Sequence, residues 1–124
     1  MNNDVIEELK RLNFEDIIWI IFIILSSLDI LADNYQKKYL INNDKYYENI
    51  ANKIYIIITI ITILIYIYFF TRNYNLYQKS SPDQKDNLKI KLLGSIFLLI
   101  GGICLLSSQI NNNQDNPFIG GPAL

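Results

Sequence analysis

Apolar residues along this chain come in long uninterrupted blocks, and these blocks predict membrane-spanning helices. The middle block, residues 54–71, reads IYIIITIITILIYIYFFT and contains no charge, glycine or proline. A helix rises about 1.5 Å per residue, so about 20 residues cross a hydrocarbon core of about 30 Å. A lone strand in lipid would leave its backbone groups without hydrogen bonds. We therefore expect a transmembrane helix at about residues 53–72, with Tyr55, Tyr66 and Tyr68 as an aromatic belt near its ends.

The next apolar block, residues 88–108, reads LKIKLLGSIFLLIGGICLLSS and predicts another transmembrane helix. Lys89 and Lys91 near its start can extend back to the lipid headgroups. Small residues recur seven positions apart, which places them on one side of the helix: Gly94, Ser95, Gly101, Gly102 and Ser108. Small side chains let helix backbones approach closely. We interpret this side as packing against other helices of the same chain, with a seam between identical copies as the alternative.

The first apolar block is shorter and is interrupted by acids. Residues 17–28 are apolar or small, and Asp29 and Asp33 follow. Twelve such residues would also suit a re-entrant segment or a buried helix. A signal peptide fits poorly, because the preceding stretch is acidic and no small-residue cleavage pattern follows. With Asp16 as N-cap, a helix over residues 16–35 is long enough to span, and we expect a third transmembrane helix there.

The segments outside these blocks predict one further short helix and a tail. Residues 4–13 place Val5, Leu9 and Leu12 on one face, which predicts an amphipathic helix on the bilayer surface, with a solvated turn as the alternative. The sequence thus predicts an all-α integral membrane protein with a single helical domain over residues 1–110. Residues 111–124, rich in Asn, Gly and Pro, are expected to be a flexible tail.

The basic residues predict an orientation. Two Lys or Arg lie in residues 1–16, four in 34–53, five in 72–91 and none in 111–124. Cytoplasmic segments carry the excess of Lys and Arg. We therefore expect a multi-pass protein of the cytoplasmic membrane, with the amino terminus inside and the carboxyl terminus outside.

Composition argues against several classes of function. The net charge of −1 provides no basic face for nucleic acid. The chain has no histidine, and its single cysteine, Cys104, lies in an apolar block, where a buried apolar role is expected. No nucleotide-binding or catalytic motif is present, so we expect neither an enzyme nor a bound cofactor or metal. The abundance of Ile, Asn, Lys and Tyr is typical of an A/T-rich genome, such as a bacterial one, and gives these residues little individual weight.

The candidate intramembrane polar residues are Ser26, Asp29 and Asp33, which share one helix face with Lys37. A carboxylate in lipid costs about 2.5–3.5 kcal/mol on insertion scales, so it usually faces protein or water. The favoured interpretation is an interfacial acid near the helix end, with an Asp33–Lys37 pair. The alternatives for Asp29 are ion or proton handling in a bundle, or a structural hydrogen bond to a threonine or tyrosine of the middle block.

These observations lead to two hypotheses of function. The first is a non-enzymatic membrane protein that works by helix–helix association. It would be an accessory, regulatory or immunity-type subunit of a larger membrane complex, or a homo-oligomer. The second is a homo-oligomeric pore or an ion- or proton-handling protein that uses Asp29. The expected partners are the lipid bilayer and either a second copy of the chain or a larger complex.

Overall fold

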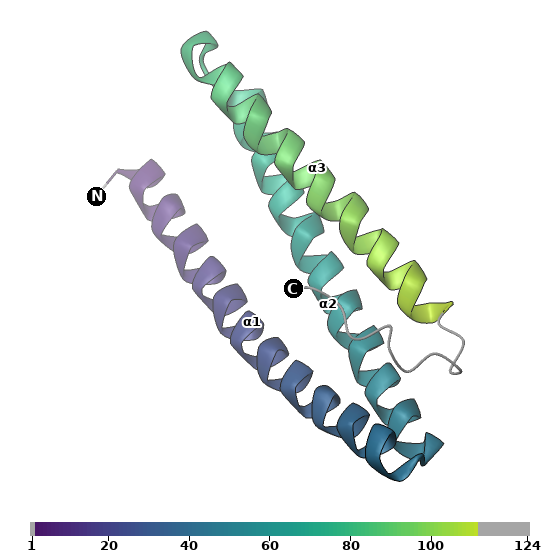
Figure 1. Cartoon of the computed structure of the whole chain (residues 1–124). Helices are drawn as coiled ribbons and strands as arrows, with labels where there is room; N and C mark the ends of the chain where they lie inside the picture. Colours follow the sequence, from purple (N-terminus) through teal and green to yellow (C-terminus); the bar gives the residue numbers. More distant parts are fainter. Residues whose placement is uncertain (1, 112–124) are drawn as a thin grey trace.

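The computed structural model describes residues 2–111, which form three long helices. Each helix runs antiparallel to the one before it. They are α1 (Asn3–Asn42), α2 (Lys45–Lys79) and α3 (Pro82–Ile110). Figure 1 shows α2 in the middle, with α1 along one side and α3 along the other. Both outer helices pack on α2 and neither packs on the other. The start of α1 and the α2–α3 turn lie at one end of the bundle, and the α1–α2 turn lies at the opposite end (Figure 1).

Capping residues mark where the helices start and stop, and each helix is longer than the apolar block within it. The Asn2 side chain accepts a hydrogen bond from the amide of Asp4 and starts α1. Asn43 takes the left-handed conformation, with φ of 55°, that closes many helices, and the Asp44 side chain then caps α2. Pro82 opens α3 at its first turn, where its missing N–H costs nothing. The two interhelical turns therefore lie at residues 43–44 and 80–81.

The helix predicted over residues 4–13 is not a separate element. It is the first part of α1, which continues without a break through the first apolar block to Asn42. Asp16, expected as an N-cap, lies inside this helix. No glycine or proline separates the two segments, and the backbone has no other reason to stop. The tail is predicted over residues 111–124, and its residues 112–124 lie outside the described part of the chain.

Packed positions recur every seven residues along both seams. On α1 they are Ile18, Leu25, Ala32 and Tyr39, and on α2 they are Ala51, Ile58 and Ile65. On α3 they are Ser95, Gly102 and Gln109. A seven-residue spacing keeps one face turned toward a partner helix, as in left-handed coiled coils. The central helix α2 thus carries two seams, one for each neighbour.

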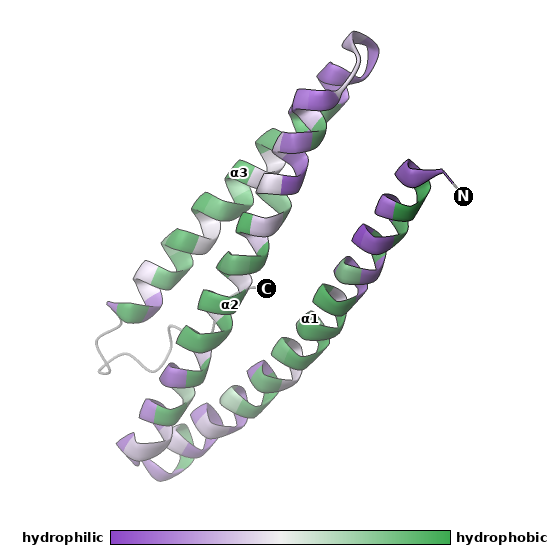
Figure 2. Cartoon of the chain, turned by 180° about the vertical axis from the view of Figure 1, so that it is seen from behind, coloured by the Kyte–Doolittle hydropathy of each residue, from purple (hydrophilic) through white to green (hydrophobic). Residues whose placement is uncertain are grey.

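Most other large apolar side chains point away from the bundle. On α1, Ile20, Ile23 and Ile24 are all more than half exposed, and Leu64 and Phe97 are equally open on the other helices. Figure 2 shows hydrophobic residues along the middle of all three helices and hydrophilic residues toward the ends. Within residues 2–111, α2 and α3 are the two helices long and apolar enough to cross a bilayer, judged by length and composition.

Candidate functional site: a polar network across three helices

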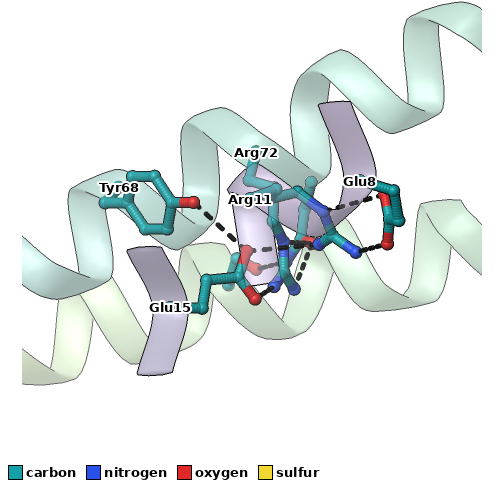
Figure 3. Close-up of polar contacts among 7 residues, drawn as sticks. Glu8, Arg11, Glu15, Tyr68 and Arg72 are labelled. Atoms are coloured by element: carbon teal, nitrogen blue, oxygen red, sulfur yellow. Dashed lines mark hydrogen bonds and ion pairs between the residues drawn. The ribbon is translucent and has the colours of Figure 1, made fainter. Parts of the chain in front are cut away.

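Glu15 of α1 is the centre of a polar cluster at the end of the bundle where the chain starts. Its side chain is buried, and its two oxygens receive three donors (Figure 3). Arg72 of α2 donates from Nη1 to Oε1 over 2.8 Å. Arg11 Nη1 lies 3.2 Å from Oε2, and the Tyr68 hydroxyl donates to the same oxygen over 3.1 Å. A buried carboxylate needs such partners, because an isolated charge in this setting is very unfavourable.

From Arg72 the network continues to α3. The Nε and Nη2 groups of Arg72 donate to Asn73 Oδ1 over 3.2 and 3.0 Å. The Asn73 amide donates to the Ser95 hydroxyl, which in turn donates to the backbone carbonyl of Lys91 over 3.1 Å. Asn73 and Ser95 are both buried. One continuous chain of hydrogen bonds therefore joins α1, α2 and α3 at a single level.

The outer edge of the network reaches solvent-exposed Glu8. Arg11 forms a bidentate pair with Glu8 and also contacts Glu15, so two arginines face two glutamates. The hydrogen bond from Arg11 holds the pKa of Glu8 below its ordinary value, and the same bond raises the pKa of Arg11. Because the formal charges balance, the cluster is well suited to fix the three helices together.

A second polar level lies toward the opposite end. The Tyr55 hydroxyl of α2 donates to Asp33 of α1, and Gln109 of α3 donates to Asn52 of α2 over 2.6 Å. Tyr55 and Arg72 lie about 26 Å apart along α2 at the usual rise per residue. That separation is close to the thickness of a bilayer's hydrocarbon core, about 30 Å. Two polar levels thus bound the apolar middle of the bundle.

The structure separates the three polar residues predicted on α1. Asp33 contacts Tyr55, as described above. Ser26 is exposed and donates to the backbone carbonyl of Phe22 over 2.9 Å. Asp29 is partly buried, one turn before Asp33. The alternative bond from a threonine to Asp29 is not formed, because Thr59 and Thr62 donate to carbonyls of their own helix.

The small residues predicted on the last helix fall on two neighbouring lines. Ser95 and Gly102 belong to the seam with α2, where a Cβ on Gly102 would lie 3.1 Å from Ile63 Cγ1. Gly94 and Gly101 have no atom within 4 Å of the place that a Cβ would occupy, and Ser108 is exposed. Within residues 2–111, the line of Ser95 and Gly102 therefore packs against α2, and the line of Gly94, Gly101 and Ser108 packs against no other helix.

Ser95 is predicted from the sequence as a packing residue, whereas Arg11, Glu15, Arg72 and Asn73 are not predicted as part of a site. Glu15 and Arg72 lie at the borders of apolar blocks, where they look like ordinary flanking charges. A usable signal was their register: Arg72 continues the seven-residue series of Ile58 and Ile65, and Glu15 precedes Ile18 by three. A charge in register with a buried series must itself meet the partner helix.

The described part of the chain offers little for metal or covalent chemistry. Within residues 2–111, no three His, Cys, Asp or Glu side chains gather closely enough to hold a metal ion. Cys104 is a free, exposed thiol on α3, and not the buried residue expected from its apolar block. The geometry provides hydrogen bonds and ion pairs between the helices and a wide apolar exterior.

Comparisons with protein-family models, curated proteins and solved structures give no match to this chain.

Proposed function

We propose that this chain is a small non-enzymatic membrane protein that spans the bilayer three times and acts through helix–helix association. The observation that carries the proposal is the exposed apolar surface between the two polar levels. Fully burying one Leu, Ile or Phe side chain is worth about 1.5–3 kcal/mol relative to water. Side chains such as Ile23 and Phe97, about two-thirds exposed, would face lipid instead.

The position of α1 supports a third span. Its buried residues Ile18 and Leu25 share one apolar cluster with Ile58 and Ile65 of α2. If α2 crosses the bilayer, the segment of α1 beside it lies at the same depth. Asp33 then falls at the far polar level with Tyr55, which accounts for an acid near the end of a span.

The open positions Gly101 and Ser108 on α3, which lie outside the polar network, support association with another copy. Small residues allow close approach of helices in lipid, where apolar surface alone gives no preference between lipid and protein. The line next to these positions is already used by α2. A neighbouring transmembrane helix fits against such a surface, and we propose a second copy of this chain as that neighbour.

Cys104 provides a direct test, because it is exposed one turn beyond Gly101. Mild oxidation of the protein in native membranes should yield a disulfide-linked dimer, and Gly101→Leu should reduce the yield severalfold. Cys104→Ser is the control for specificity. A chain that stays monomeric by mass in nanodiscs and gives no cross-link would overturn homo-association. Helix association would then have to be with a different membrane protein.

A second candidate function is ion or proton handling through Asp29. The observation in its favour is that Asp29 is partly buried directly after the apolar segment of α1, close to Asp33 and Tyr55. Conductance measurements on reconstituted protein separate this candidate from the first.

A further inference from the structure

Residues of all three helices line an amphipathic pocket beside the Glu15–Arg72 network. Its volume is about 600 Å³. Trp19 and Phe22 line it from α1, Phe69 and Arg72 from α2, and Lys91 and Leu98 from α3. The Trp19 ring centroid lies 5.7 Å from that of Phe22 and 5.8 Å from that of Phe69, so the aromatic rings form a continuous wall. The pocket is therefore apolar along most of its length and cationic at one end.

The cationic end carries positive charge that the protein does not fully neutralise. The Arg72 guanidinium lies 4.8 Å from the Phe69 ring centroid and is paired with Glu15. Lys91 is exposed, and its amino group makes no hydrogen bond or ion pair with any of residues 2–111. Lys91 thus adds an unneutralised ammonium to the lining of the pocket, which also contains an arginine held in place by Glu15.

The rest of the described chain leaves the pocket open on one side. Because α1 and α3 pack on α2 and not on each other, the space between them has no helix in front of it. A Cβ on Gly94, which also lines the pocket, would meet nothing within 4 Å. In a bilayer this opening faces lipid, at the depth where headgroups meet acyl chains.

We propose that this pocket binds one anionic phospholipid of the inner leaflet. Its phosphate lies against Lys91 and the edge of Arg72, and one acyl chain runs along Phe22 and Leu98 toward the bilayer centre. A basic pocket between membrane helices on the cytoplasmic side is suited to an anionic headgroup, and the apolar wall is suited to a chain. The binding site rests on the proposed membrane placement, since the pocket opens to lipid only if α1 and α3 both span.

Trp19 reports on the pocket, because it is the single tryptophan of the chain and lies in the pocket wall. The full chain is reconstituted into phosphatidylcholine vesicles that contain a small fraction of phosphatidylglycerol with a brominated acyl chain. Bromine quenches tryptophan on contact. We expect stronger quenching by brominated phosphatidylglycerol than by brominated phosphatidylcholine at the same mole fraction, with a relative association constant about fivefold in favour of the anionic lipid.

Lys91→Gln should reduce this preference to near unity while leaving quenching by brominated phosphatidylcholine unchanged. The matched control is Lys89→Gln, because Lys89 is also exposed but does not line the pocket. It should keep the preference. Equal quenching by the two lipids in the unaltered protein, or equal loss in both variants, would overturn the lipid site while leaving the membrane placement intact. A Trp19 that neither brominated lipid quenches would overturn both.

Discussion

Glu15 and Arg72, 57 residues apart in the sequence, form a partly buried ion pair between α1 and α2, with 2.8 Å between Oε1 and Nη1. The pair is the junction of a hydrogen-bond chain that passes through Asn73 and reaches Ser95 on α3. α1 and α3 do not pack on each other. At that end of the bundle, this series of hydrogen bonds therefore connects the two helices through α2.

Replacing Glu15 should lower the stability of the bundle at the end where α1 starts. Glu15→Gln leaves Arg72 without its countercharge, while Arg11 keeps its pair with Glu8. Breaking a buried pair by removing one partner costs about 3–5 kcal/mol. We expect a loss near the lower end of that range, because Arg11 and Arg72 are partly exposed. Thermal unfolding in detergent would measure it. The control is Glu7→Gln, an exposed site on the same helix. Equal stability of the two variants would show that the network contributes nothing.

The two neighbouring glycines of α3 should respond differently to a large side chain. Gly102→Leu drives a Cβ to within 3.1 Å of Ile63 and 3.4 Å of Tyr66, and overpacking of this kind typically costs about 1–3 kcal/mol. Gly101→Leu meets open space within the described chain and should leave monomer stability unchanged. Unfolding midpoints in detergent, at a protein concentration that keeps the chain monomeric, compare the two. Similar destabilisation by both would contradict the packing described for α3.

The second polar level can be tested through a single hydroxyl. Tyr55→Phe removes the donor to Asp33 while keeping the ring, and a hydrogen bond to a charged group is worth about 1.5–3 kcal/mol. We expect a loss at the lower end, because Asp33 is exposed. Tyr46→Phe, at an exposed tyrosine of the same helix, is the matched control. Unfolding of both variants in detergent should show a loss for Tyr55→Phe alone. Destabilisation by the control to the same degree would mean that the Asp33 contact is not the cause.

Hydropathy predicted where the apolar segments lie, and capping chemistry determined where the helices end. The apolar blocks of residues 54–71 and 88–108 lie within α2 and α3, but both helices extend further into polar sequence. The α1–α2 turn could be predicted from Asn43 and Asp44, whose side chains and backbone preferences favour a helix stop and a new start. Nothing in a hydropathy profile marks the helix ends themselves.

The network was harder to predict, because it depends on how the helices align with one another. A single helix shows that Glu15 precedes a buried series, but not which residue of another helix lies opposite it. Arg72 could be identified only once the antiparallel register of α1 and α2 was known. In the same way, Ser95 and Gly101 appear equivalent as small residues, and only the seam with α2 distinguishes them.

Asp29 separates the two proposed functions. If the protein acts through helix association, Asp29→Asn should leave assembly and stability nearly unchanged, since amide and carboxylate have similar shape. Reconstituted vesicles should then show no conductance that depends on this residue. A pH-dependent ion or proton flux that is present in the unaltered protein and lost in Asp29→Asn would instead favour the ion-handling function.

The central claim is that α1 crosses the membrane beside α2, and the accessibility of single cysteines tests it most directly. In a Cys104→Ser background, one cysteine is introduced at Lys10, at Ile24 or at Lys37, all exposed on α1. A membrane-impermeant maleimide should label the Lys37→Cys variant in intact cells and the Lys10→Cys variant only after the membrane is opened. Ile24→Cys, in lipid, should stay unlabelled in both conditions. Labelling of the Lys10 and Lys37 positions from the same side would contradict a spanning α1.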